Sequence, residues 1–280
     1  MDFCVIMDSC GDMSKEWEEL SYIIRVPLTL RMGTRELVDD GSHSQEEILD
    51  LIRNSESCPK SACPAPGEYL NYFEKNAGKR IYVITGTSSL SGSYNSAKNA
   101  ERMFLEDFPD EQIAVFDSKS ATAGETRLVQ RILSWEEEKL DFTKVCSLLQ
   151  REIETQKLRF VLEDLSFLHS SGRLKGVKYL LANKLNIMPI LAATEEGTIV
   201  EVGKARGKAN AMRKLFSKIE AAFMERDSVK VVISHCSCLD EAKELKKKII
   251  ELNKSVQITI VATGGIATLY AGYKGIVVAF

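Results

Sequence analysis

The sequence has few histidines and no repeated cysteine pairs. His43, His169 and His235 are its only histidines, and none lies in an H-E-x-x-H helix or after a nucleophile elbow. Its seven cysteines are scattered and odd in number, which argues against a disulfide framework. Cys236 and Cys238 follow His235, but zinc needs four ligands and no second ligand pair lies nearby in the sequence. We therefore predict neither hydrolase chemistry nor a metal site.

The chain also lacks a basic surplus and long apolar runs. Its 37 basic and 40 acidic residues give a net charge of −3, and no segment is dense in Lys and Arg. We therefore predict no nucleic-acid partner. No apolar stretch reaches the ~20 residues of a membrane helix, and Met1-Asp2 does not begin a basic and then apolar signal peptide. We predict no membrane span and a cytoplasmic location.

Short apolar runs alternate with helical patterns, and the 44% of hydrophobic residues is enough for two cores of ordinary size. In the first half this alternation is typical of a doubly wound, parallel α/β sheet. We expect strands at residues 3–8, 24–30, 80–85 and 112–117. We expect helices at residues 45–53, 67–75, 91–106 and 121–138.

The second half has a different pattern. Apolar runs at 186–193 and 197–204 are joined by a tight turn at 194–197, which predicts an antiparallel hairpin. Helices at 208–225 and 239–253 and strands at 230–234, 257–262 and 275–280 are expected to follow. The predicted fold class is α/β, with two domains and the ligand between them. An N-terminal parallel-sheet α/β/α domain covers residues 1–155 and a C-terminal mixed α+β domain covers 156–280, with the boundary inside the helical stretch 142–156.

The most informative segment is TGTSSLSGSYNSA at residues 85–97, between a predicted strand and a predicted helix. The first N–H groups of a helix have no intrahelical partner and carry a positive partial charge, so they favour a small anion such as phosphate or carboxylate. Ser88 and Ser91 add uncharged hydroxyl donors, and Gly92 lets a ligand approach the backbone. Helix capping by Ser and Thr alone is the alternative interpretation.

Polar residues follow three of the predicted strands, at Asp8-Ser9, at residues 85–91 and at Asp117-Ser118. In a parallel sheet the carboxyl ends of the strands lie along one edge, where ligands bind. Their convergence favours a ligand site over simple capping. For Asp8 we favour a structural role, accepting backbone N–H bonds, because a second carboxylate beside an anionic ligand would repel it.

Six segments together resemble the DegV family over nearly the whole chain. Two are specific: LSGSYNSA at residues 90–97 and LSFLHSSGRLKG at 165–176. The run SACPAPGE at 61–68 stands in place of a TSQPSPGE-like segment, and the others are Asp8-Ser9, Asp117-Ser118 with Gly124, and the PIL run at 189–191. The resemblance is to the fatty-acid-binding subunit type of that family.

The resemblance implies a protein that holds one long-chain fatty acid in an apolar tunnel between its domains and presents the carboxylate to a separate ATP-binding kinase subunit. It implies no cofactor and no catalysis by this chain. Ser61 matches the hydroxyl of the TSQPS segment, and Ser91 with Gly92 matches the SG of LSG. The family's third group is a histidine near the C-terminus, and alignment places Thr268 there, so an uncharged hydroxyl replaces an imidazole.

Arg173 lies in the SGRL run. An arginine held by a Ser-Gly turn near a domain junction can dock a partner, recognise phosphate or pair with a carboxylate between the two halves. The resemblance favours a functional role.

Three functions from different classes remain open. The first is fatty-acid binding without catalysis, and the second is a DegV-like carrier that has diverged towards another lipid or small molecule. The third, an enzyme using an activated serine or a phosphorylated substrate, is the least supported, because the sequence shows neither a Ser-His pair nor a P-loop lysine.

Overall fold

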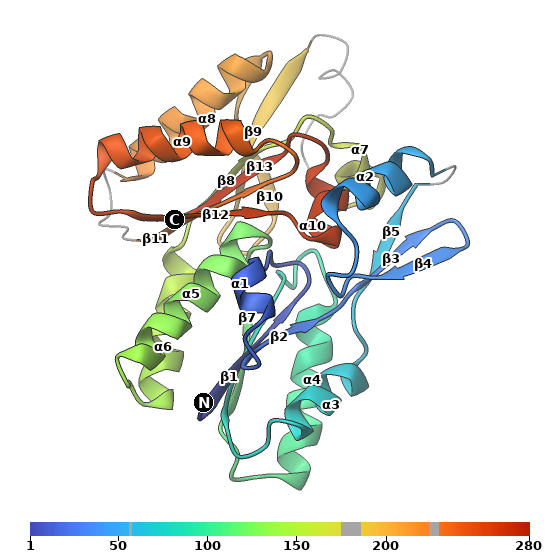
Figure 1. The fold of residues 1–280 in the computed structure, drawn as a ribbon, viewed down its shortest axis with the longest axis vertical. Helices are drawn as coiled ribbons and strands as arrows, with labels where there is room; N and C mark the ends of the chain where they lie inside the picture. Colours follow the sequence, from blue (N-terminus) through green and yellow to red (C-terminus); the bar gives the residue numbers. More distant parts are fainter. Residues whose placement is uncertain (56–57, 175–185, 224–229) are drawn as a thin grey trace.

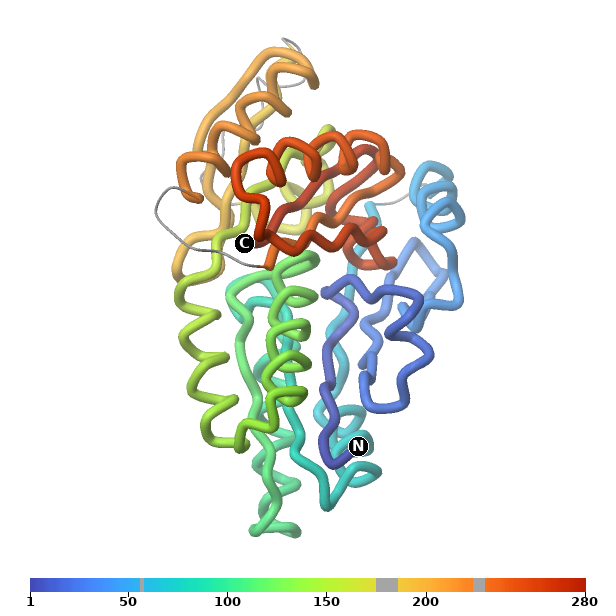
Figure 2. The backbone as a smooth tube through the Cα atoms, turned by 60° about the vertical axis from the view of Figure 1, so that its left-hand side comes forward, coloured from blue at the N-terminus to red at the C-terminus, as the bar shows by residue number. Residues whose placement is uncertain are grey.

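A computed structural model describes residues 1–55, 58–174, 186–223 and 230–280. The last two residues of the LSFLHSSGRLKG run and the end of the helix expected at 208–225 lie outside these ranges. Residues of the first half occupy one end of the molecule and those of the second half the other, as the colours in Figures 1 and 2 show. In the described part no helix is long and apolar enough to cross a membrane.

The first half contains a four-stranded parallel sheet in the order β2-β1-β6-β7. One face is covered by α3 (Pro66–Glu74) and α4 (Ser93–Asp107), and the other by α5 (Ala123–Glu137) and α6 (Phe142–Thr155). This three-layer arrangement confirms the predicted α/β/α fold. The strands are β1 (Phe3–Asp8), β2 (Ile23–Val26), β6 (Arg80–Thr85) and β7 (Ile113–Asp117), and the short helix α1 (Lys15–Glu18) joins the first two.

The single strand expected at residues 24–30 is wrong, because the chain breaks it at Pro27. Proline has no N–H to donate to a sheet, and β2 ends at the preceding residue. The chain then enters a separate antiparallel sheet in the order β4-β3-β5, which no sequence pattern predicted. Its strands are β3 (Thr29–Met32), β4 (Arg35–Val38) and β5 (Lys60–Ala62), and α2 (Gln45–Arg53) lies between β4 and β5.

The second half is built on a six-stranded mixed sheet in the order β10-β9-β8-β13-β11-β12. Only β11 and β12 pair in parallel, which confirms the predicted mixed α+β fold. The hairpin of β9 and β10 is confirmed, whereas β8, an inner strand, was missed. The strands are β8 (Leu158–Val161), β9 (Ile187–Ala193), β10 (Ile199–Arg206), β11 (Lys230–His235), β12 (Gln257–Ala262) and β13 (Ile276–Ala279).

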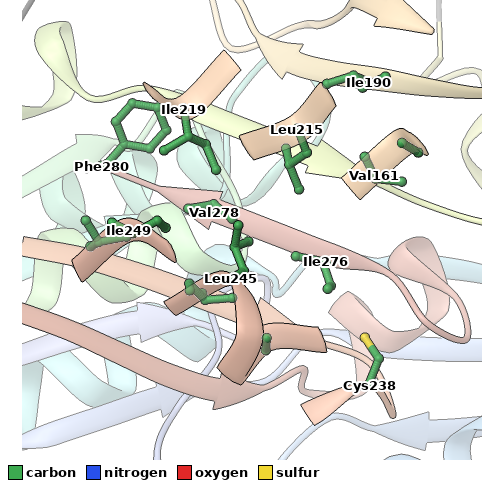
Figure 3. Packing of buried hydrophobic residues seen from close by; sticks show 14 of the residues in the cluster. Val161, Ile190, Leu215, Ile219, Cys238, Leu245, Ile249, Ile276, Val278 and Phe280 are labelled. Carbon is green, nitrogen blue, oxygen red and sulfur yellow. The ribbon is translucent and has the colours of Figure 1, made fainter. Parts of the chain in front are cut away.

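The two faces of this sheet pack against different partners. Val161, Ile190 and Val278 lie on the face that α8 (Lys208–Phe223) and α9 (Leu239–Leu252) cover, and Figure 3 shows this core. Leu158 and Phe160 alternate with Val161 along β8 and lie on the other face. That face points towards the first half and towards two short helices that were not predicted, α7 (Ser166–Ser170) and α10 (Gly265–Ala271).

Two buried carboxylates of the first half hold the start of α10. Asp12 Oδ1 accepts a hydrogen bond from Gly264 N at 2.9 Å. Asp39 accepts one from Gly265 N at 3.0 Å and one from Ile266 N at 2.9 Å. These N–H groups have no partner within the helix, so the carboxylates satisfy them and complement the helix dipole. The position of α10 is therefore fixed by residues more than 200 positions away in the chain.

The Asp12 carboxyl group predicts a pH dependence of stability. Burial raises its pKa from 3.8 to about 7. Between these values the folded protein keeps a proton that the unfolded chain releases, so the free energy of unfolding falls as the pH rises, by up to about 1.4 kcal/mol per pH unit. In Asp12→Asn this contribution is removed while the oxygen facing Gly264 is kept, so we expect a smaller decline in urea-unfolding free energy over this pH range. Asp110→Asn, which changes an exposed aspartate, is the control. If the unfolding free energy of Asp12→Asn declined with pH as much as that of the wild-type protein, Asp12 would not be the source of the decline.

Candidate functional site

A cavity of about 850 Å³, part of it open to solvent, lies between the first half and the six-stranded sheet. The loops after β1, β6 and β7 supply one wall, and β8, β13 and α10 supply much of the other. Most of the lining side chains are apolar, and they include Leu158, Phe160, Leu162, Ile266 and Val277. The arrangement therefore favours an apolar ligand.

The predicted convergence of the strand ends is confirmed by bonds between their loops. Thr87 N, after β6, donates to Ser120 O, after β7, at 2.8 Å. Thr122 N donates to Cys10 O, after β1, also at 2.8 Å. All four residues line the cavity. Asp8 has the structural role that we favoured, since its carboxylate accepts from Cys10 N and Gly86 N at 3.0 Å each.

Polar side chains gather at one part of the cavity. Ser61 Oγ and Tyr270 Oη share a hydrogen bond of 2.8 Å. The guanidinium carbon of Arg173 lies 5.1 Å from the centre of the Tyr270 ring, and Arg173 Nε donates to Leu90 O at 2.9 Å. Arg173 is the only cationic side chain among the described lining residues, and no carboxylate pairs with it in the described structure. A positive charge therefore stands beside hydroxyl groups at this polar cluster.

Ser91 also lines the cavity, just before α4. Its hydroxyl donates to Ser93 Oγ at 3.1 Å and accepts from Ser93 N at 3.3 Å. The N-cap of α4 is Gly92, which has no side chain to cap the helix. The Ser91 hydroxyl therefore accepts from the first N–H of α4 and also lies at the cavity wall.

Three other predicted site residues do not line the cavity. Ser88 donates to the carboxylate of Asp117 through both its backbone N and its hydroxyl. A Cβ atom at Gly92 would lie 2.8 Å from Cys63 Sγ, so glycine permits a close packing there. Thr268 is fully buried, with its hydroxyl 2.7 Å from that of Thr263. Of the six predicted residues, the structure brings Ser61, Ser91 and Arg173 to the cavity.

Tyr270 was missed by the sequence analysis. Alignment with the family motif places Thr268 at the expected binding position. The face of α10 that reaches the cavity instead carries Ile266, Ala267, Tyr270 and Ala271. Their spacing is that of one helical face. Recognition of a short helix in GGIATLYAG would have identified Tyr270 as its polar member.

The cysteines beside His235 are engaged in the fold. Cys238 N donates to His235 Nδ1 at 3.4 Å, and Cys238 Sγ contacts Gly275 O at 3.4 Å. Burial raises the pKa of the Cys238 thiol to about 12 and also raises that of Cys236. Both cysteines are therefore buried groups of the fold and lie outside the cavity.

The turn of the β9–β10 hairpin closes the cavity against the first half. Gly197 has φ +76, and both it and Thr87 line the cavity. A Cβ atom at Gly197 would lie 2.1 Å from Thr87 Oγ1 and 2.9 Å from the Lys119 Cα atom. Ser89 Oγ donates to the carbonyl of Glu196 in the same turn. The backbone of the hairpin turn therefore packs directly against the first half, with no room for a side chain at Gly197.

We expect Gly197→Ala to destabilise the protein by about 1–3 kcal/mol, because the change combines an unfavourable backbone conformation with a steric clash. Gly172→Ala is the matched control, since Gly172 has φ +72 but no atom within 4 Å of the added Cβ. In urea unfolding, Gly172→Ala should lose less free energy of unfolding than Gly197→Ala. Equal losses of unfolding free energy in the two variants would show that the close contact of the hairpin turn with Thr87 has no effect on stability.

The parallel sheet with helices on both faces, the mixed six-stranded sheet and the largely apolar cavity between them define an α/β protein with a candidate ligand site between its two halves. The sequence profile of the family described as "Uncharacterised protein, DegV family" matches residues 2–280, and the chain belongs to the DegV family. A DegV domain-containing protein of Streptococcus pneumoniae is 31% identical over 258 residues, which is 92% of this chain and 90% of that protein.

Solved structures of the family match along the whole chain. A DegV family protein from Ruminococcus gnavus, solved with vaccenic acid, is 38% identical with a TM-score of 0.94, and the match covers 100% of this chain and 99% of that one. The Fatty Acid Kinase (Fak) B3 protein of S. pneumoniae, loaded with linoleic acid, is 29% identical with a TM-score of 0.88 and the same coverage. A Eubacterium eligens protein loaded with heptadecanoic acid is 27% identical with a TM-score of 0.88, covering 99% and 98% of the two chains.

Proposed function

We propose that this protein binds one long-chain fatty acid in the cavity, with the carboxylate at Ser61, Ser91, Arg173 and Tyr270. The observation that carries the proposal is the cavity itself, which is apolar along most of its wall and holds a cluster of hydroxyl groups beside the single lining cation of the described residues. The acyl chain would lie between an N-terminal domain of residues 1–155 and a C-terminal domain of residues 156–280. The fatty acids bound to the relatives from R. gnavus, S. pneumoniae and E. eligens support this ligand class.

The energetics of the cavity suit such a ligand. Each methylene group transferred from water to an apolar wall contributes ~0.8 kcal/mol, so the acyl chain supplies most of the affinity. A carboxylate removed from water must instead be hydrogen-bonded or paired with a positive charge. In this proposal the hydroxyl groups of Ser61, Ser91 and Tyr270 and the guanidinium of Arg173 do this. Ser88, Gly92 and Thr268 lie outside the cavity and do not contact the ligand in this proposal.

The protein acts as a binding subunit in this proposal, without cofactor or catalysis of its own. None of the three histidines is among the described lining residues, so no imidazole stands beside Ser91 to activate it. The likeness to the Fak B3 protein supports a role in presenting the carboxylate to a separate ATP-binding kinase subunit. Arg173, beside the proposed carboxylate, is then suited to interact with a phosphoryl group on it.

The direct test is native mass spectrometry of the purified protein, followed by extraction and identification of what is released. The proposal expects one long-chain fatty acid per chain. A bound lipid without a carboxylate, with fatty acids rejected in exchange experiments, would instead establish the diverged carrier.

Ser61→Ala and Ser91→Ala should each weaken fatty-acid binding by about 1–3 kcal/mol, the cost of leaving a buried acceptor without its donor. Calorimetric titration of the delipidated protein with a fatty acid and with its methyl ester measures the effect. The losses should be larger for the acid, because the ester carries no charge. Ser88→Ala is the control outside the cavity and should leave the acid affinity nearly unchanged. If the parent protein binds acid and ester equally, the placement of the carboxylate is wrong.

A further inference from the structure

Three buried side chains form a cluster beside the cavity that the proposed ligand does not use. Asp8 ends β1, Cys10 lies two residues further along the chain, and Glu125 is in the first turn of α5. One carboxylate oxygen of Asp8, the Sγ atom of Cys10 and one carboxylate oxygen of Glu125 lie within 4.8 Å of one another. The exposed fractions of the three residues are 0%, 9% and 0%. Two carboxyl groups and a thiol therefore meet in the interior.

The carboxyl group of Glu125 has no partner in the described structure. Neither of its oxygens takes part in a hydrogen bond. The ion pairs among the described residues include neither Glu125 nor Asp8. Buried polar groups are almost always hydrogen-bonded, and a buried charge without a partner is costly. The cluster therefore calls for a group of positive charge.

The surrounding backbone holds the three side chains close together. A Cβ atom at Gly11 would lie 2.9 Å from Glu125 Cβ and 3.2 Å from Glu125 Oε2. A Cβ atom at Gly86 would lie 3.1 Å from Cys10 Sγ and 3.5 Å from Glu125 Oε1. Asp8 is fixed from the other side, because its two oxygens accept from Cys10 N and Gly86 N at 3.0 Å each. The two glycines thus let the backbone enclose the cluster tightly.

A metal ion fits the chemistry of this cluster. In a tetrahedral zinc site, Zn–O bonds of about 2.0–2.2 Å and Zn–S bonds of about 2.3 Å place the ligand atoms ~3.4–3.6 Å apart. This separation lies within the 4.8 Å that encloses the three ligand atoms. Magnesium and calcium take oxygen ligands, whereas zinc accepts both carboxylate and thiolate. The donor set therefore favours Zn²⁺.

We propose that Asp8, Cys10 and Glu125 bind one zinc ion that joins the end of β1 to the start of α5. On binding, the Cys10 thiol releases its proton to solvent and coordinates as the thiolate. Cys10 also lines the cavity, which gives the ion a way in and leaves its fourth position to a water molecule. The sequence analysis missed this set because Glu125 is distant in the chain from the other two ligands. The proposal goes beyond the proposed function and does not depend on it.

Equilibrium dialysis of the delipidated, chelator-treated protein against Zn²⁺, followed by metal analysis, tests the site. We expect one Zn²⁺ per chain and no competition by Mg²⁺. Glu125→Gln and Cys10→Ala each remove a ligand and should weaken the binding of Zn²⁺ at least about tenfold. Cys4→Ala is the matched control, because it removes another fully buried thiol of β1 that lies outside the cluster, and it should bind Zn²⁺ as the wild type does.

Cobalt substitution tests the identity of the ligands. Co²⁺ in place of Zn²⁺ should give the charge-transfer absorption of a cobalt–thiolate bond in the wild-type protein and in Cys4→Ala. This absorption should be absent from Cys10→Ala. Zn²⁺ should also raise the Tm of the wild-type protein, because the folded chain alone presents the three ligands together, and should raise that of Glu125→Gln by less.

A folded wild-type protein that binds no Zn²⁺ would overturn the proposal, and this result does not require any variant to fold. Zn²⁺ binding of equal strength in the wild type, Glu125→Gln and Cys10→Ala would also overturn it, because the ion would then be held elsewhere, for example at the exposed Cys58 or Cys63. All of these measurements use the protein without a fatty acid, so a failure of the proposed function would leave them unaffected.

Discussion

The capping of α10 by carboxylates from the other half is the interaction on which the cavity depends. The N–H groups at residues 264–266 need acceptors, and in this fold Asp12 and Asp39 supply them across the interface. Gln45 adds hydrogen bonds to the side chain and carbonyl of Thr263. With its start fixed in this way, α10 turns an apolar face and the Tyr270 hydroxyl towards the cavity.

The same interface buries several acidic groups at a cost in stability. Burial raises the pKa values of Asp8, Asp12 and Asp39 although each accepts a backbone hydrogen bond, and it raises the pKa of Glu125, whose carboxyl oxygens have no donor in the described structure. A fold optimised only for stability would replace such groups by apolar ones. Their presence is understandable because each of the three aspartates holds backbone N–H groups of a segment that lines the cavity or leads to it.

The interior of the molecule divides into surfaces of distinct chemistry. The six-stranded sheet buries one face under α8 and α9 and gives the other to the cavity, because neighbouring residues of a strand point to opposite sides. On its cavity side the sheet supplies an apolar wall, whereas Ser61, Tyr270 and Arg173 supply hydroxyl groups and a positive charge. The cavity therefore presents two kinds of surface, one apolar and one polar.

Sequence patterns predicted the α/β class, the hairpin and most helices of the first half, and the family resemblance predicted six ligand-binding residues, of which Ser61, Ser91 and Arg173 line the cavity. These follow from periodicity and turn chemistry, or from local motifs that match a family. The inner strand β8 and the position of Tyr270 at the cavity are visible only in the three-dimensional fold. Such features depend on partners distant in the chain: Tyr270 meets Ser61 across 209 positions. A sequence pattern records local preference, whereas a binding site is made by contacts between segments that the pattern does not relate.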